Sequence, residues 1–179
     1  MKRVLVISDI HGNLAALEAV VAKFPSLKPD QVAILGDHAL FGPKPTETID
    51  LIRKLQSSGA LVTAGTGDIA VADLDPSTTL ELIGQTDARL VCVGFTHQAR
   101  VKDYGWKVIV DAGSAGLPYD GEASAAFAVI DIDPEAATIS AEIHRATYDT
   151  DAVSDAITAR GLAGDAYRAA TVRTGKMVR

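Results

Sequence analysis

The sequence has few of the residues that stabilise a protein by means other than a hydrophobic core. It contains one cysteine in 179 residues, so no internal disulfide can form. Cys92 lies among Leu90, Val91 and Val93 and is expected to be a core thiol in a reducing compartment. Aromatic residues make up only 5% of a chain that is 47% hydrophobic, which favours an α/β core. We therefore expect one domain, residues 1–179, of the α/β class.

Long apolar runs and a positive net charge are also absent from the sequence. The apolar run after Met1-Lys2-Arg3 is broken at Asp9, which is too early for a signal peptide, and no run approaches a membrane span. The net charge of −6 and the pI near 5.1 disfavour a protein that follows the phosphates of a nucleic acid. These absences predict a cytoplasmic protein that acts on a small substrate and binds neither membrane nor nucleic acid.

The N-terminal stretch Val4–Asn13 contains the first candidate site. Four apolar residues, three of them β-branched, predict a buried strand, and Asp9 and His11 follow it directly. An aspartate and a histidine two residues apart can turn toward one point, and together they suit Zn, Mn or Fe. The alternative interpretation is a surface Asp9 and a capping Asn13 without a metal.

The same arrangement recurs along the first half of the chain. A second predicted strand, Gln31–Leu35, ends in Gly36-Asp37, and a third, residues 60–64, is followed by Thr66–Asp68. Strand–helix–strand crossovers of this length imply a parallel sheet, whose ligands bind beyond the carboxyl ends of the strands. The sequence therefore brings Asp9, Asp37 and the Thr66–Asp68 turn to one edge.

Helical spacing predicts the segments between and after these strands. A first helix begins after Asn13 and is expected to stop at Pro25, and a second opens at Thr46. Further helices are predicted over Ser77–Ile83 and Thr150–Arg160, with Gly161 as the stop of the latter. The remaining tail, rich in Lys and Arg, is expected to be a solvated basic end.

The second half of the chain shows a different periodicity. Leu90–Val93 predicts a strand that leads to His97, at a position equivalent to those of Asp9 and Asp37. Two predicted hairpins then suggest a mostly antiparallel sheet, formed by residues 100–103 with 106–111 and by 125–133 with 138–145. The glycine-rich loop Gly113–Pro118 either passes close to the site or is only a turn, and the turn is favoured.

Taken in order, these motifs resemble those of the calcineurin-like metallophosphoesterases, particularly their small bacterial phosphodiesterase branch. The family signature is D-x-H, G-D, G-N-x-D, a His-Gly pair and G-H-x-H. Here Asp9-Ile10-His11 matches the first motif and Gly36-Asp37 the second. The resemblance implies a metallophosphoesterase-like α/β sandwich of two sheets flanked by helices, reduced by loss of an insert between residues 68 and 94.

The resemblance also implies a metal centre, of which one half is complete. The ligands of one family metal would here be Asp9, His11, Asp37 and His97. The second metal shares the Asp37 position, but its other ligands are missing: Thr66 replaces an asparagine, Phe95 replaces a histidine, and no His-Gly pair exists. Gly67 stands where some members carry a general-acid histidine. We therefore expect one divalent transition-metal ion (Mn, Zn or Fe), with Phe95 as an apolar plug and His38 at most behind the ligands.

Three functional hypotheses follow from this resemblance. The first is a metal-dependent hydrolase of small phosphodiesters or phosphomonoesters with weak activity, in which Asp37 and His97 are the catalytic residues. The second is a non-catalytic scaffold, as in the phosphoesterase-like subunit of the retromer coat. The third is a shortened or engineered form of an active enzyme. In each case the missing insert would expose a sheet edge, so a homodimer is expected.

Overall fold

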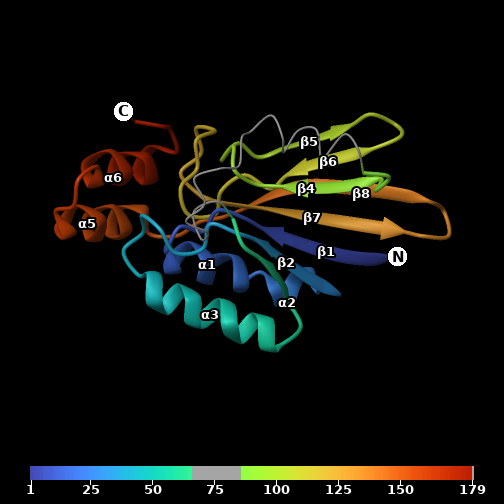
Figure 1. The fold of residues 1–179 in the computed structure, drawn as a ribbon, viewed down its shortest axis with the longest axis horizontal. Coiled ribbons are helices and arrows are strands. Elements are labelled where there is room, and N and C mark those ends of the chain that lie inside the picture. Colours follow the sequence, from blue (N-terminus) through green and yellow to red (C-terminus); the bar gives the residue numbers. More distant parts are fainter. Residues whose placement is uncertain (66–85, 179) are drawn as a thin grey trace.

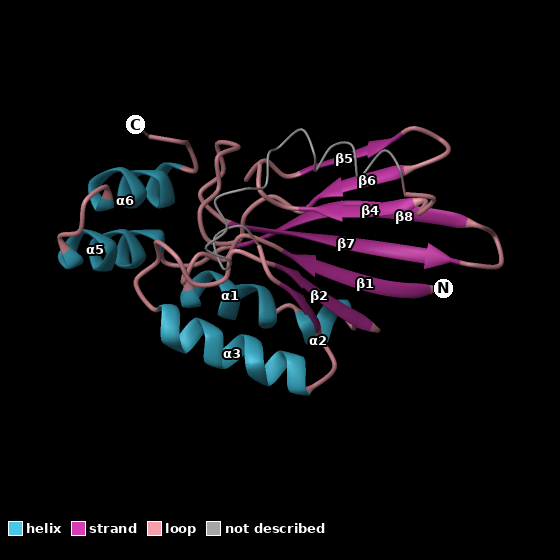
Figure 2. Ribbon diagram, viewed as in Figure 1, coloured by secondary structure: helices cyan, strands magenta, loops and turns pink. Residues whose placement is uncertain are grey.

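The computed structural model describes residues 1–65 and 86–178 (Figure 1). Three layers follow one another: helices α1 to α3, a five-stranded sheet and a three-stranded sheet (Figure 2). The elements are β1 (Lys2–Ile7), α1 (Leu14–Val21), α2 (Phe24–Leu27), β2 (Gln31–Leu35), α3 (Pro45–Ser57), β3 (Leu61–Thr63), β4 (Leu90–Val93), β5 (Arg100–Asp103), β6 (Val108–Asp111), β7 (Ala125–Asp133), β8 (Thr138–Ala146), α5 (Thr150–Arg160) and α6 (Asp165–Thr174). The two-sheet α/β sandwich flanked by helices is thus confirmed.

The larger sheet has the strand order β3-β2-β1-β7-β8 and the smaller one has the order β4-β6-β5. Strands β1, β2 and β3 are parallel, whereas β7 and β8 are antiparallel to their neighbours. In the smaller sheet β4 pairs with β6 in parallel, and β5 pairs with β6 as a hairpin. The ends of β1, β2 and β4 therefore bring the following loops together.

Strand β1 lies between two hydrophobic cores, which explains its unbroken apolar run. Leu5 and Ile7 pack with Leu17 of α1 in the core beneath the helices, whereas Val6 packs with Val110 in the core between the sheets. All five side chains are at most 1% exposed. Because successive strand residues face opposite sides of a sheet, a strand buried on both faces needs apolar residues at every position.

The predicted strands and the two hairpins are confirmed, but their assignment to one antiparallel sheet was wrong. The hairpin β5–β6 joins β4 in the small sheet, and the hairpin β7–β8 joins β1 in the large one. Periodicity shows that a hairpin forms but does not show which sheet receives it.

Two predicted helix boundaries also differ from the structure. Pro25 does not end the first helical segment; α1 ends at Val21, and Pro25 lies in the first turn of α2, where its missing N–H has no helical partner to lose. Pro45 similarly opens α3 one residue before the expected Thr46. The helix predicted over residues 77–83 lies outside the described residues.

The C-terminal tail is not the solvated basic end that its composition suggested. It forms α6, whose Ala169 and Val172 pack against Val153 and Ile157 of α5 in a small third core. Figure 1 shows this helix pair beyond the loops that follow β1 and β2. Within the described part of the chain, no helix is both long enough and apolar enough to cross a membrane.

Candidate metal centre

The loops after β1 and β2 are joined by their backbones. The N–H groups of Asp9, His11 and Gly12 donate to the carbonyls of Gly36, Asp37 and His38 at 3.2, 2.8 and 2.7 Å. This ladder continues the parallel pairing beyond the strands and sets the two aspartates side by side. Thus Asp9, His11 and Asp37 are held on one rigid double loop.

All four predicted ligands have a left-handed backbone, which is costly for residues other than glycine. Their φ angles are +52° for Asp9, +53° for His11, +50° for Asp37 and +56° for His97. Such a conformation costs of order 1–3 kcal/mol and persists only where the surroundings enforce it. The left-handed conformation bends the backbone sharply after each strand, so that the side chains turn back over the end of the sheet.

The imidazole nitrogens and carboxylate oxygens of these four side chains lie close together. Nε2 of His11 lies 3.2 Å from Nε2 of His97, and Oδ1 of Asp9 lies 3.3 Å from the latter and 3.8 Å from the former. Oδ2 of Asp37 lies 3.9 Å from Nε2 of His11. Ligand atoms bound tetrahedrally at 2.0–2.1 Å are about 3.3 Å apart, so these donors have the spacing that one transition-metal ion requires.

The two oxygens of Asp9 have separate roles. Oδ2 accepts hydrogen bonds from Ser8 Oγ at 2.5 Å and from the N–H of Phe95 at 3.0 Å, whereas Oδ1 faces the imidazoles. Burial alone would raise the pKa of Asp9, but the hydrogen bond and charge of His97, together with the hydrogen bonds from Ser8 and from the Phe95 N–H, lower it below its usual value. The carboxylate is thus kept ionised and aimed.

His97 is oriented by the opposite side of its ring. Its Nδ1 lies 2.6 Å from the carbonyl oxygen of Leu117, which can only accept, so Nδ1 carries a proton and Nε2 offers its lone pair when the ring is neutral. Burial opposes protonation, yet the hydrogen bond and charge of Asp9 raise the pKa of His97. For His11, burial and the nearby charge of His97 lower the pKa. His97 therefore holds a proton more readily than a free imidazole does, and His11 holds one less readily.

The glycine-rich loop passes against the site, contrary to the preferred interpretation as a mere turn. The N–H groups of Ala115 and Gly116 donate to the carbonyls of Ser8 and Asp9, and Ser114 Oγ also donates to that of Asp9 at 2.7 Å. A Cβ on Gly116 would lie 1.8 Å from the carbonyl oxygen of Ile10. Only a glycine allows this close approach, which the sequence alone did not show.

Phe95, which was expected to plug the second metal position, and His38, which was expected behind the ligands, differ in burial. Phe95 does not fill the position of a second metal, because its side chain is 64% exposed. It contributes its backbone N–H to Asp9 instead. His38 is buried and its Nε2 lies 2.9 Å from the carbonyl oxygen of Thr63, so it links the site to β3. Thr66, Gly67 and Asp68 lie outside the described residues.

Aromatic residues on both sides of the ligands were missed by sequence reasoning. Phe41 packs on the ring of His11, with centroids 5.3 Å apart, and Tyr119 stacks on the ring of His97 at 4.3 Å. Neither residue belongs to a recognisable motif. The only available signal was the scarcity of aromatics in the chain, which gives each one more weight.

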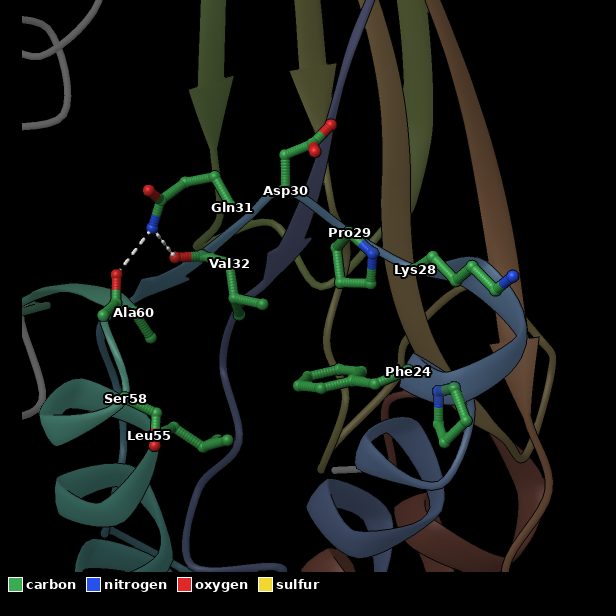
Figure 3. Close-up of a pocket in the computed structure, with 11 residues that line it drawn as sticks. Phe24, Lys28, Pro29, Asp30, Gln31, Val32, Leu55, Ser58 and Ala60 are labelled. Carbon is green, nitrogen blue, oxygen red and sulfur yellow. Dashed lines mark hydrogen bonds between the residues drawn. The ribbon is translucent and has the colours of Figure 1, made fainter.

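A pocket also lies at the other end of β2, between α2 and the C-terminal end of α3 (Figure 3). It has a volume of about 420 Å³, and Phe24 and Leu55 are among its lining residues. Its amide side chain, Gln31, already donates to the carbonyls of Val32 and Gly59 at 3.0 and 2.8 Å. This pocket offers no cluster of donor atoms comparable to that of Asp9, His11 and His97, the set that the described residues supply for a metal.

Comparisons with known proteins cover the same part of the chain as the candidate site. Residues 2–69, which include three of the four expected ligands, match the family model of calcineurin-like phosphoesterases. An uncharacterised protein of Methanocaldococcus jannaschii, MJ0912, is 42% identical over 52 residues, which are 29% of this chain. The matched segment spans only 21% of that relative's length.

Solved structures extend the likeness to nearly the whole chain. Hypothetical protein PH1004 of Pyrococcus horikoshii superposes with a TM-score of 0.77 at 18% identity, covering 99% of this chain and 100% of that one. A metallophosphoesterase of Sphaerobacter thermophilus gives 0.70 at 20% identity, covering 97% and 99%. Vps29 of Entamoeba histolytica, solved with zinc, gives 0.54 at 18% identity, covering 80% and 99%. The N-terminal residues 2–69 thus match the calcineurin-like phosphoesterase model, and the chain as a whole has the fold of the solved metallophosphoesterase structures.

Proposed function

We propose that the protein hydrolyses small phosphoesters with a single-ion centre held by Asp9, His11, Asp37 and His97. The observation that carries the proposal is the convergence of two imidazole nitrogens and a carboxylate oxygen within 3.2 to 3.8 Å of one another. The family whose model matches residues 2–69 consists of phosphoesterases, which supports the reaction class.

The donor set suits a divalent ion in charge as well as in spacing. Two carboxylates and two neutral imidazoles carry a net charge of −2, which one divalent cation balances. Bound there, such an ion would supply Lewis-acid and water-activating chemistry toward a phosphoester. Without it, the carboxylates of Asp9 and Asp37 would repel each other, because both lie close to His11.

The protein's own residues hold these donors in place. Ser8 and the Phe95 amide fix one oxygen of Asp9, so that the other stays directed at the centre. The Leu117 carbonyl fixes the ring of His97, and Tyr119 covers its face. A ligand set arranged before the metal binds loses little entropy on binding. Because the residues that the structure describes bring together one set of metal donors, a phosphate would be clamped from one side only, so we expect weak turnover.

Hydrolysis of bis(p-nitrophenyl) phosphate by the purified chain with added Mn²⁺ tests this proposal. His97→Ala is expected to lower the rate at least 100-fold and to lose the metal, since it removes a ligand. His144→Ala is the matched control, because His144 lies on β8, is one-third exposed and pairs with Glu142. Equal rates for the two variants, or no hydrolysis by the unaltered chain, would refute the proposed reaction.

A non-catalytic binding protein is the second candidate, and the exposure of Phe95 favours it. An aromatic side chain that is 64% exposed beside a metal centre offers apolar area to a partner. Metal binding alone does not separate the two candidates, because a binding protein could hold an ion with the same donors. A chain that binds one ion but does not hydrolyse the phosphodiester would support the binding protein.

Two further parts of the proposal concern the setting of the protein. A homodimer through the β3 edge is supported by Leu61, whose side chain on that strand is 61% exposed. Light scattering that shows a strict monomer at high concentration would count against it.

A reducing, cytoplasmic location is supported by the single cysteine, which has no second thiol in the chain to pair with.

A further inference from the structure

The C-terminal helix pair contacts the loop at residues 41–42 through two arginines: Arg168 of α6 places its guanidinium 4.5 Å from the ring centroid of Phe41, and Arg160 binds the backbone. Arg160, the last residue of α5, donates from Nη1 to the carbonyl of Gly42 at 2.5 Å and from Nη2 to that of Phe41 at 2.7 Å. These carbonyls lie 118 and 119 positions earlier in the chain. A guanidinium presents its donors in a fixed fork, so two carbonyl acceptors specify its place more closely than a single contact would.

Arg160 is itself held by a buried carboxylate. Nη2 and Nε of Arg160 donate to the two oxygens of Asp165 at 2.7 and 3.3 Å. Asp165 is 2% exposed and also accepts from the N–H of Leu162 and from Arg168. These contacts lower the pKa of Asp165 despite the opposing effect of burial. A bidentate pair of this kind fixes the orientation of the guanidinium that binds the 41–42 loop.

The loop that Arg160 binds is in turn fastened to a predicted metal ligand. The N–H of Gly42 donates to the carbonyl of His11 at 2.5 Å, and that of Lys44 donates to Gly12 at 3.0 Å. The contact is so close that a Cβ on Gly42 would lie 2.2 Å from the His11 carbonyl oxygen. The side chain of Phe41, whose carbonyl Arg160 binds, packs on the His11 ring. A shift of residues 41–42 therefore moves the backbone and the ring of His11.

We infer that Arg160 is a positioning residue of the metal centre, and that the α5–α6 pair with Asp165 holds the ligand His11 in its strained conformation. The inference rests on the proposed function, because it concerns the metal of that same site. It predicts that the last helices are required for metal affinity although they supply no ligand.

Co²⁺ binding followed by visible absorption tests this role, because the spectrum reports the geometry of the ligands around the ion. Arg160→Met keeps much of the side-chain length and removes the fork; it is expected to weaken Co²⁺ binding at least about tenfold and to change the absorption band. Arg160→Lys, which restores one donor, is expected to recover part of the affinity.

Arg173→Met is the matched control. Arg173 lies on α6 and pairs with Asp151 and Asp155 of α5, so it joins the same two helices, but it is 47% exposed and its guanidinium is directed at these two carboxylates rather than at the 41–42 loop. Its loss is expected to leave the Co²⁺ affinity and spectrum unchanged.

The outcomes separate this inference from the function on which it rests. Unchanged affinity and spectrum in Arg160→Met, with Co²⁺ bound by the unaltered chain, would overturn the inference alone. Equal weakening in Arg160→Met and Arg173→Met would also overturn it, because helix packing would then suffice as the cause. Failure of the unaltered chain to bind Co²⁺ would overturn the metal centre and this inference together. If Arg160→Met does not fold, the comparison of Arg160→Lys with Arg173→Met decides in the same way.

Discussion

The two ends of the five-stranded sheet are built from the same strands but differ in where strain and buried polarity lie. At the carboxyl ends, six non-glycine residues near the site have a positive φ, and Asp9, His11 and His97 are buried together. At the amino end of β2, Gln31 bonds to nearby carbonyls, Asp30 accepts from the N–H of Arg3, and the pocket is open (Figure 3). Strain and polar burial concentrated at one end indicate function there.

Loss of a carboxylate should have the largest effect, and only at the carboxyl ends. Asp37→Asn is expected to abolish tight metal binding, because it removes a ligand and its charge. His38→Ala removes a contact behind the ligands and should cost about 10–100-fold in affinity. Asp30→Asn, at the amino end, should leave the affinity unchanged. Calorimetric titration with Zn²⁺ measures all three, and equal metal loss in the first two variants would contradict the assignment of Asp37.

A methyl group added to a glycine tests the same contrast through folding stability. In Gly116→Ala the new Cβ would lie 1.8 Å from the Ile10 carbonyl oxygen, so the loop must move, and a loss of about 3 kcal/mol in the free energy of unfolding is expected. Gly59→Ala meets nothing within 4 Å, and its φ of +103° costs about 1 kcal/mol of backbone strain. Urea unfolding measures both, and a larger loss for Gly59→Ala would reverse the comparison.

Gln31→Ala should have a smaller effect, confined to stability. The amide of Gln31 donates to the carbonyls of Val32 and Gly59, in a partly exposed position, so its removal should cost about 1 kcal/mol. Metal affinity should not change, because the side chain lies at the amino end of β2. A fall in Zn²⁺ affinity of tenfold or more would show that the two ends are coupled.

The thiol of Cys92 gives the smallest expected effect. Burial raises the pKa of Cys92 to about 11, so the thiolate is scarce at neutral pH. The folded state then holds the proton more tightly than the unfolded state, and its stability falls as pH rises from about 9 toward 11. Alkylation by iodoacetamide should accelerate over that range and be the same with and without metal. Protection by metal would mean that Cys92 contacts the ion in addition to the histidines and aspartates of the candidate centre.

Sequence reasoning reached the parts of the fold that local pattern determines. The strand before Asp9, the strand before Asp37 and the two hairpins follow from apolar runs and turn residues, and the structure confirms them. The choice of sheet for each hairpin did not follow, since it depends on packing between distant segments. The helix α6 was missed because its apolar residues are few and mostly small, with Ala169 and Val172 among its buried positions.

Of the candidate site, the sequence predicted the proposed ligands but not the groups that orient them. Asp9, His11, Asp37 and His97 were proposed from motifs, and the structure brings three of them within 4.8 Å, with Asp37 beside His11. The groups that orient them are mostly backbone carbonyls and amides, such as the Leu117 oxygen and the Phe95 N–H, which almost every residue type has, proline alone lacking the N–H. No sequence pattern distinguishes such groups. The exposure of Phe95 and its φ of +80° are not specified by the sequence either.

A single bound ion distinguishes this centre from a two-metal one, and the metal content of the reconstituted protein measures it directly. The chain is freed of metal, loaded with excess Mn²⁺, Zn²⁺ or Fe²⁺, desalted and measured by elemental analysis against protein concentration. One ion per chain is expected, and it should be lost in Asp9→Asn and retained in Asp30→Asn. Two ions per chain bound with comparable affinity, or none with any of the three metals, would contradict it.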